Sequence, residues 1–360
     1  MAKKGSKKKI ILIIVPVILV LLIAGWCVFT VLIYNDNFDK RFETYEPIMF
    51  KVEDFEGLKR DEYKFPSDDG QMLAGYWYSA GSGQRGIIVL AHGFGGGGHN
   101  SYMDVINYFA HNGYYVFAYD ATGNDASEGD GVGGVPQGVI DLDYAISFVE
   151  KSGNFPSLPI GLFGHSWGGY SVCAVLTYHP EVKAVIECCG CNRSSDLFEA
   201  GGKEQAGGVI YTMMPFAKLH EWIKFGKYAT NTALDGFDAS SAHIMAVHSE
   251  DDGVVPIEYG YDKYYEKYKD DARFTFVRFT DKGHNEIMND KDNTYKDELN
   301  AEFDDWLTTL GYDYKAEENK ERFAKDKAEY LHQHLDRTRW STRLDMELMG
   351  KFVDYYNANI

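Results

Sequence analysis

Residues 158–170 read L-P-I-G-L-F-G-H-S-W-G-G-Y, and this stretch decides the fold that the sequence predicts. A short apolar run at residues 160–163 predicts a strand that leads into G-H-S-W-G, residues 164–168, and helix-forming residues follow from Tyr170. In a G-x-S-x-G turn between a strand and a helix, the serine hydroxyl is exposed beyond the edge of the sheet, and the two glycines leave room for the returning helix. Ser166 is therefore the candidate nucleophile.

Strand and helix patterns alternate on both sides of this turn. Such alternation over short intervals predicts an α/β fold with a doubly wound, mostly parallel sheet, in which the active site lies at the carboxyl ends of the strands. Continuous apolar runs are typical of strands that are buried on both faces of a parallel sheet. The predicted strands are residues 72–78, paired as a hairpin with the segment before it, and residues 86–91, 114–119, 160–163, 182–188, 243–248 and 274–279. The helical patterns cover residues 101–111, 136–150, 170–179, 257–269 and 296–310, of which the last is expected to close the domain.

Composition and charge exclude several classes of protein. The chain has 360 residues, and 45% of them are hydrophobic, which is enough for a sizeable core and argues against a disordered protein. Its formal net charge is −18. That charge has the wrong sign for binding phosphate backbones, so no nucleic-acid partner is expected.

The N-terminus predicts a membrane anchor. Residues 10–33 contain no charged side chain, and at about 1.5 Å per residue they are long enough to cross a hydrocarbon core of about 30 Å. A cleaved signal peptide would have a shorter apolar run and a small-residue cleavage site, which this segment lacks. By the positive-inside rule, the basic tail at residues 1–9 is cytoplasmic and everything after Tyr34 lies outside the cytoplasm. The lysines of this tail are Lys3, Lys4, Lys7, Lys8 and Lys9.

The rest of the chain divides into several expected parts. Residues 34–62 predict a juxtamembrane linker, residues 63–312 the α/β domain, and residues 313–360 a helical C-terminal extension. The alternation breaks at residues 190–242, where apolar residues recur close to helical spacing. We interpret this insert as a helical cap over the site, with an ordinary pair of core helices as the alternative. Its candidate substrate-binding residues are Met213, Met214, Phe216 and Trp222.

Three chemical groups for nucleophilic catalysis follow predicted strands. A serine hydroxyl becomes a strong nucleophile when an imidazole accepts its proton and a carboxylate orients that imidazole. The chain supplies Ser166, then the acidic run at residues 250–252, then His284. Only His284 lies in the loop after the last strand, which favours it over His92, His99, His165, His243 and His248. Within the acidic run, the alternatives Glu250, Asp251 and Asp252 stay open.

The five cysteines do not indicate a metal or redox site. Cys188, Cys189 and Cys191 cluster after an apolar run, but no second pair of ligands follows at the spacing of a zinc site. Free thiols are among the most buried side chains in proteins. We therefore expect buried thiols, no metal and no organic cofactor.

Four motifs together resemble the alpha/beta-hydrolase superfamily. They are G-H-S-W-G-G at residues 164–169, H-G-F-G at 92–95, D-D-G-V-V-P at 251–256 and K-G-H at 282–284. The chain is most similar to the lid-bearing branch of lysophospholipase-like, monoacylglycerol-lipase-like and serine-aminopeptidase-like enzymes, over about residues 63–311. The resemblance implies the alpha/beta-hydrolase fold and a triad of Ser166, Asp252 and His284. Asp252 is preferred among the acids because the family pattern has the carboxylate four residues before the proline, here Pro256.

The resemblance also implies two backbone donors for an oxyanion. One is the N–H of Trp167, the residue after the nucleophile, and the other is the N–H of Phe94. The four glycines at residues 95–98 allow that second loop unusual conformations, with a flexible linker as the alternative. At residues 119–127 the sequence departs from the family's D-x-R-G-x-G-x-S loop, since the arginine and the second glycine are missing.

These features predict a single-pass, membrane-anchored serine hydrolase. We expect it to cleave carboxylic esters with apolar acyl groups through an acyl-enzyme, so its partners would be a small-molecule ester or lipid and the membrane. A serine-aminopeptidase-like peptidase or an acyltransferase on the same fold is the alternative enzyme. A catalytically silent binding module is the alternative outside enzymes. The sequence carries no signal for the oligomeric state.

Overall fold

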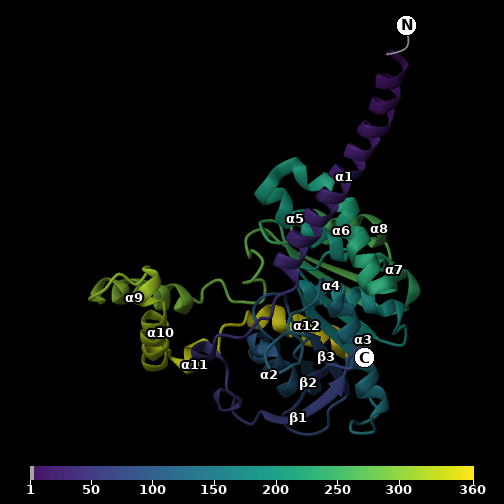
Figure 1. The fold of residues 1–360 in the computed structure, drawn as a ribbon. Coiled ribbons are helices and arrows are strands. Elements are labelled where there is room, and N and C mark those ends of the chain that lie inside the picture. Colours follow the sequence, from purple (N-terminus) through teal and green to yellow (C-terminus); the bar gives the residue numbers. More distant parts are fainter. Residues whose placement is uncertain (1–3) are drawn as a thin grey trace.

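An eight-stranded sheet forms the centre of the molecule, and helices cover both of its faces (Figure 1). The structure is a computed structural model that describes residues 4–360. The strand order is β1-β2-β4-β3-β5-β6-β7-β8. Strands β1 and β2 form the predicted antiparallel hairpin, β2 also pairs antiparallel with β4, and all the other neighbours are parallel. The strands are β1 (Lys59–Pro66), β2 (Met72–Ser79), β3 (Gly86–Ala91), β4 (Tyr114–Tyr119), β5 (Ile160–His165), β6 (Ala184–Cys188), β7 (His243–Ser249) and β8 (Phe274–Phe279).

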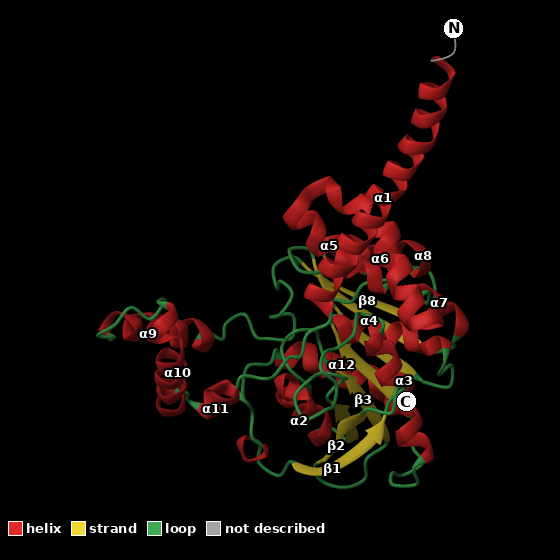
Figure 2. Ribbon diagram, viewed as in Figure 1, coloured by secondary structure: helices red, strands yellow, loops and turns green. Residues whose placement is uncertain are grey.

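Figure 2 shows the helices that surround this sheet, together with the long helix α1 that projects from it. The α-helices are α1 (Lys4–Phe38), α2 (Met103–His111), α3 (Gln137–Lys151), α4 (Trp167–Ala174), α5 (Ser194–Ala206), α6 (Ile210–Phe225), α7 (Ala233–Ala239), α8 (Tyr261–Tyr268), α9 (Tyr295–Thr309), α10 (Lys320–His334), α11 (Arg337–Trp340) and α12 (Met346–Asn359). Short 3-10 turns are η1 (Glu46–Ile48), η2 (Val52–Asp54), η3 (His99–Tyr102), η4 (Val175–Thr177), η5 (Gly207–Val209), η6 (Gly226–Ala229), η7 (Ile257–Tyr259) and η8 (Glu317–Asn319).

The alternation of apolar side chains across the central strands builds a core on each face of the sheet. On β3, Ile88 and Leu90 join the buried cluster that includes α2 and α12, whereas Ile87 and Val89 join the cluster that includes α3 and α4. Every residue of β3 is buried, as expected of a strand covered on both faces. The predicted α/β fold with a doubly wound, mostly parallel sheet is therefore confirmed.

The helix that packs on the sheet at the end of the chain is α12. We expected residues 296–310 to close the domain, and this is wrong: α9 buries only Tyr295 and Leu299. Its sequence is rich in acidic residues, and it lies with α10 and α11 to one side of the sheet (Figure 1). Helix α12 instead buries Phe352 and Tyr356, and the Tyr356 hydroxyl donates to the Leu162 carbonyl oxygen at 2.6 Å.

Helix α1 continues from its apolar segment into the folded domain. It is the one helix among the described residues that is long and apolar enough to cross a membrane. Residues 12–25 are exposed, whereas Thr30 and Tyr34 are completely buried. The helix ends at Phe38, beyond the predicted anchor at residues 10–33. Residues 1–3 of the predicted basic tail lie outside the described part of the chain.

A buried carboxylate joins α1 to the insert at residues 190–242. The Tyr34 hydroxyl donates to Glu221 Oε1 at 2.6 Å, and the Ser194 hydroxyl donates to Glu221 Oε2 at 2.7 Å. Tyr34 also accepts a hydrogen bond from the Val135 N–H at 3.2 Å. Burial raises the pKa of Glu221 to about 7, although the two hydroxyl donors act in the opposite direction. Helices α1, α5 and α6 therefore meet at one titratable group.

We expect Glu221→Gln to change how stability depends on pH. A carboxyl group with a raised pKa in the folded state binds more protons when folded than when unfolded. It therefore lowers the free energy of unfolding as the pH rises from about 4.5 to about 7. Glutamine has no such titration, so the Tm of the variant relative to the wild type should increase between about pH 5 and about pH 8. Thermal unfolding of the full-length protein in detergent measures this difference, and a difference that stays constant with pH would contradict the expectation.

Candidate active site

The turn between β5 and α4 holds Ser166 in a strained backbone conformation. Its φ is 59° and its ψ is −117°, in a region that non-glycine residues rarely adopt. A Cβ atom on Gly164 would lie 2.2 Å from the carbonyl oxygen of Gly168, and one on Gly168 would lie 2.0 Å from the carbonyl oxygen of Ala91. Only glycine fits at both positions. The predicted strand, turn and helix are thus present, with the serine at the carboxyl end of β5.

The structure brings Ser166, His284 and Asp252 together in one hydrogen-bonded chain. Ser166 Oγ lies 2.8 Å from His284 Nε2, and His284 Nδ1 lies 2.7 Å from Asp252 Oδ2. The three side chains come from loops after β5, β8 and β7, and all three residues are buried. This is the mutual geometry that a nucleophile, a general base and an orienting carboxylate require.

Several donors hold Asp252 as a carboxylate. Its Oδ1 accepts hydrogen bonds from the N–H groups of Val254 at 2.9 Å and Val255 at 2.8 Å. Its Oδ2 lies 3.2 Å from Nε2 of the fully buried His248, in addition to the contact with His284. Burial alone would raise the pKa of Asp252, but the hydrogen bonds from His248 and His284 outweigh it and hold that pKa well below its usual range.

The two neighbouring acids have other partners. Asp251 Oδ1 accepts from the Ser249 hydroxyl at 2.5 Å and from the Gly283 N–H at 2.9 Å, so it fixes the loop that carries His284. Glu250 pairs with Arg278 at the surface, with an N–O distance of 2.8 Å. Of the acidic run, Asp252 alone contacts the imidazole of His284 within hydrogen-bonding distance.

His165 supports the backbone of His284 rather than the nucleophile. Its Nε2 lies 3.0 Å from the His284 carbonyl oxygen, which can only accept, so the proton is assigned to Nε2. Its Nδ1 then accepts from the Tyr102 hydroxyl at 2.8 Å, and that hydroxyl accepts from the Gly93 N–H at 3.0 Å. Burial lowers the pKa of His165 to about 3, which keeps the ring neutral. The loop before the glycines is thereby connected to the His284 loop.

The other rival histidines have structural contacts. His92 accepts from the Ala121 N–H at 3.0 Å, and His99 pairs with Asp120 at 2.7 Å. His243 lies half-buried at the first residue of β7, far along the strand from its carboxyl end.

The two candidate oxyanion donors, Trp167 and Phe94, have free backbone N–H groups. The Trp167 amide opens helix α4, and among residues 4–360 neither amide donates to a protein acceptor. The Phe94 ring packs between Phe38, Phe42 and Trp167, at centroid distances of 5.5, 5.0 and 5.4 Å. These contacts hold the residue whose N–H would face an oxyanion.

The glycine-rich loop after β3 is held by specific contacts. The Gly98 N–H donates to Asp125 Oδ2 at 2.8 Å, and a Cβ atom on Gly98 would lie 1.9 Å from Asp120 Oδ1. Gly97 has a φ of 87° and lies against Thr44. Asp120 and Asp125 belong to the loop that departs from the family pattern. That loop therefore packs under the glycines and orders them.

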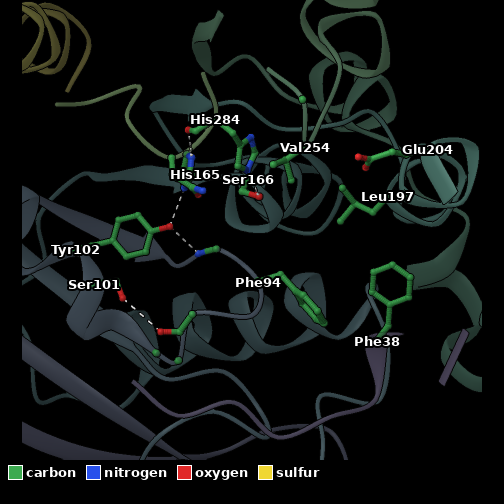
Figure 3. A pocket seen from close by; sticks show the side chains of 17 residues that line it. Phe38, Phe94, Ser101, Tyr102, His165, Ser166, Leu197, Glu204, Val254 and His284 are labelled. Carbon is green, nitrogen blue, oxygen red and sulfur yellow. Dashed lines mark hydrogen bonds between the residues drawn. The ribbon is translucent and has the colours of Figure 1, made fainter. Parts of the chain in front are cut away.

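A cavity of about 480 Å³ lies beside Ser166 (Figure 3). Helix α5 contributes Leu197, Gly201 and Glu204 to its wall, and the end of helix α1 contributes Phe38. Sequence reasoning missed Phe38 because residues 34–62 were assigned to a linker, and it missed the three residues of α5 because the substrate-binding candidates in the insert were chosen from residues 213–222. The other lining residues are Gly93, Phe94, Gly96, Gly97, Gly98, Ser101, Tyr102, His165, Gly253, Val254, His284 and Asn285.

The four cap residues expected to contact substrate do not line this cavity. Met213 and Met214 are buried in a cluster with Tyr34, because the apolar face of α6 packs on α1. Phe216 is half-buried, and Trp222 is 57% exposed. At the cavity beside Ser166 the insert contributes α5 and none of the four expected residues, so substrate binding by those four stays a prediction.

The ring nitrogens near the one thiol of the site are already hydrogen-bonded. Cys189 Sγ lies close to nitrogen atoms of His165, His248 and His284, and these atoms could in principle hold a metal ion. Each of these histidines, however, is engaged with a carbonyl, a carboxylate or Ser166. Burial also raises the pKa of the Cys189 thiol well above its usual value, which disfavours the thiolate that metals bind. All five cysteines are free.

Comparisons with known proteins agree with this fold. The sequence model of the family described as serine aminopeptidase, S33, matches residues 82–225. An esterase from Pyrococcus furiosus is 16% identical, with a TM-score of 0.54 over 76% of this chain and 98% of that chain. A second crystal form of the same esterase is 18% identical, with a TM-score of 0.52 over 75% of this chain and 96% of that chain.

The alpha/beta hydrolase GrgF from Penicillium sp. sh18 is 19% identical, with a TM-score of 0.48 over 68% of this chain and 97% of that chain. No curated protein sequence matches the chain. The family match and the esterase structure confirm the resemblance to the alpha/beta-hydrolase superfamily at the level of the fold.

We expect Gly98→Ala to impair the site through the position of Phe94. The added methyl group would collide with Asp120 and displace the loop, and a small displacement of a reacting group costs about 10- to 100-fold in rate. The second-order rate of covalent labelling by a fluorophosphonate probe should fall by that factor. Gly96→Ala is the matched control and should lower the rate far less, because Ser101 Oγ at 4.0 Å is the nearest atom to its added methyl. Equal rates for the two variants would contradict this role of Gly98.

Proposed function

We propose that this protein is a serine hydrolase that cleaves carboxylic esters with apolar acyl groups through an acyl-enzyme. The observation that carries the proposal is the chain of hydrogen bonds from Asp252 through His284 to Ser166 at the side of a cavity. A hydroxyl, an imidazole and a carboxylate in this order are the minimum set for acyl transfer. The match to a serine hydrolase family over residues 82–225 supports the same chemistry.

In the proposed reaction, Ser166 Oγ attacks the ester carbonyl carbon while His284 Nε2 accepts its proton. Asp252 orients the imidazole and stabilises its charged form. The N–H groups of Phe94 and Trp167 donate to the oxyanion, and each such donor lowers the barrier by about 3 kcal/mol. His284 then donates the proton to the leaving alcohol, and a water molecule, deprotonated by the same imidazole, hydrolyses the acyl-enzyme.

The preference for apolar acyl groups rests on the side chains around Ser166. Phe38, Phe94, Leu197 and Val254 line the cavity with apolar side chains (Figure 3). Burying an acyl chain against such surface is favourable by about 0.8 kcal/mol for each methylene group removed from water.

Membrane anchoring through α1 is part of the proposal. The lysines before the apolar segment favour a cytoplasmic N-terminus, with the catalytic domain on the other side of the membrane. Thr30 and Tyr34 are fully buried in the domain, so the apolar helix is continuous with the folded protein. Cleavage at the end of residues 10–33 would remove Thr30 from this core.

A peptidase that removes N-terminal residues is the second candidate. The family match is described as serine aminopeptidase, and the Glu204 carboxylate at the cavity could pair with the amino group of a peptide. Release of acid from nitrophenyl esters, compared with release of amine from aminoacyl amides, separates the two candidates. Faster amide cleavage would favour the peptidase.

We expect Ser166→Ala to lower kcat by about 10⁴- to 10⁶-fold with little change in Tm. The full-length protein in detergent is the appropriate sample, because Tyr34 of α1 belongs to the core. A fluorophosphonate probe should label the wild type and leave Ser166→Ala unlabelled. Equal labelling of both proteins would remove Ser166 from the mechanism.

We expect Asp252→Asn to lower kcat by about 10⁴-fold, since an amide favours the wrong tautomer of the catalytic imidazole. Asp251→Asn is the matched control next to it in the chain. Asp251 contacts Ser249 and Gly283 and not the His284 ring, so its replacement should cost far less activity. If Asp251→Asn had the larger effect, the assignment of the acid would be wrong.

A further inference from the structure

A second cavity, of about 290 Å³, adjoins the cavity at Ser166. Phe38, Leu197 and Gly201 line both cavities, so the two adjoin at these residues. The second cavity lies between α1 and α5, and residues at the start of α6 also line it. We call this second cavity the α1–α5 groove. Its lining is mainly apolar.

The groove runs along α1 in the direction of the apolar segment. Trp26, Phe29 and Ile33 line it from one face of α1, three and four residues apart. Leu197, Gly201 and Gln205 line it from α5, on successive turns of that helix. The span from Phe38 to Trp26 corresponds to about 18 Å at about 1.5 Å per residue, which is the scale of a long acyl chain.

Hydrogen bonds fix the wall formed by α1. Trp26 Nε1 donates to Thr212 Oγ1 at 3.1 Å, near the start of α6, and Asn35 Oδ1 lies 3.0 Å from His220 Nε2, near its end. Helices α1 and α6 therefore run side by side in the same direction. The apolar helix is thus one fixed wall of the groove.

Adjacent glycines on α5 have different environments. A Cβ atom on Gly202 would lie 2.2 Å from Ile210, so this glycine allows α5 to pack on α6. A Cβ atom on Gly201 would meet no atom within 4 Å. Glycine is unfavourable inside a helix, and at Gly201 no close packing requires it. The absence of a side chain at Gly201 leaves free space where the two cavities adjoin.

The far end of the groove lies at the expected membrane boundary. A helix needs about 20 residues to cross the hydrocarbon core, so a span that begins at residue 10 ends near Phe29. Trp26 and Phe29 line the groove at that level. Val209 and Tyr211, at the same end of the insert, are 50% and 53% exposed. Aromatic and apolar side chains of this kind are favoured where a protein meets the lipid head groups.

We propose that the α1–α5 groove binds the acyl chain of a membrane lipid ester and leads its carbonyl group from the adjacent leaflet to Ser166. This inference rests on the proposed function, because it names the substrate class of the same site. The occupant is a bilayer lipid rather than a soluble ester, because the groove adjoins the catalytic cavity and is lined by the helix that we expect to cross the membrane. Helix α1 is thereby an anchor and a wall of the substrate path.

The test compares long and short esters with a variant that blocks the passage. Full-length protein in phosphatidylcholine vesicles is assayed with nitrophenyl palmitate in the bilayer and nitrophenyl acetate in water. Gly201→Phe should lower the ratio of kcat/KM for palmitate to that for acetate by at least about 10-fold. Lys203→Phe adds the same ring to an exposed position of α5 outside the groove and should leave the ratio within about 2-fold. An unchanged ratio in Gly201→Phe would overturn the inference.

A second measurement does not depend on catalysis. Ser166→Ala protein in vesicles that contain a phosphatidylcholine with a diazirine on its acyl chain should crosslink at Ile33, Leu197 or Met213. Gly201→Phe should reduce crosslinking at Leu197. Crosslinks confined to the exposed residues 12–25 of α1 would contradict the proposal that the acyl chain binds in the α1–α5 groove. If the wild type cleaved neither ester, the proposed function would fail, and these crosslinks would still decide whether lipid enters the groove.

Discussion

The close backbone approach at the β5–α4 turn is the constraint on which the rest of the site depends. Gly164 and Gly168 allow the first turn of α4 to pass within contact distance of β5 and of the end of β3. Ser166 takes up the resulting strain with a positive φ. Any side chain at the two glycines would separate the strand from the helix, and the hydroxyl would lose its position relative to His284. The strained conformation persists because the buried strands β3 and β5 and helix α4 pack closely around the turn.

Interactions from distant parts of the chain hold the partners of this serine. His165, next to Ser166 in the chain, donates to the carbonyl oxygen of His284, and Asp251 accepts from the N–H of Gly283. Lys282 donates to the carbonyl oxygen of Asn289 at 2.9 Å and pairs with Asp345, the residue that caps α12. The C-terminal helix thus supports the loop that carries His284 as well as the sheet. The backbone of His284 is held by these contacts, and its ring is hydrogen-bonded to Ser166 and Asp252.

Local sequence patterns were sufficient for the sheet and for Ser166, His284 and their order along the chain. The strand, the glycine turn and the helix around Ser166 are specified within about a dozen residues. Because the carboxyl ends of parallel strands lie at the same edge of a sheet, residues that follow different strands are brought together there. The choice of Asp252 over Asp251 needed the resemblance, because both carboxylates follow the same strand. Only three-dimensional contacts distinguish the one that faces His284.

Contacts between remote segments were not predictable in the same way. Phe38 lies 56 residues before Phe94 in the chain, yet their rings pack together beside Ser166. The apolar face of α6 suggested a substrate surface, but the same face also fits a packing partner, and α1 fills that role. Helix α12, and not α9, packs on the sheet where we expected residues 296–310. The reason is that α12 has apolar side chains one turn apart that can be buried together, whereas α9 is rich in acidic residues.

The acyl-enzyme is the central claim, and mass spectrometry of the protein during turnover tests it most directly. Full-length protein is mixed with excess nitrophenyl ester, quenched in acid after a few turnovers, digested and mapped. We expect the acyl group on the peptide that contains Ser166, at up to one equivalent per protein and absent after the ester is consumed. Continuing turnover with no adduct at Ser166, or with the acyl group on another residue, would contradict the account.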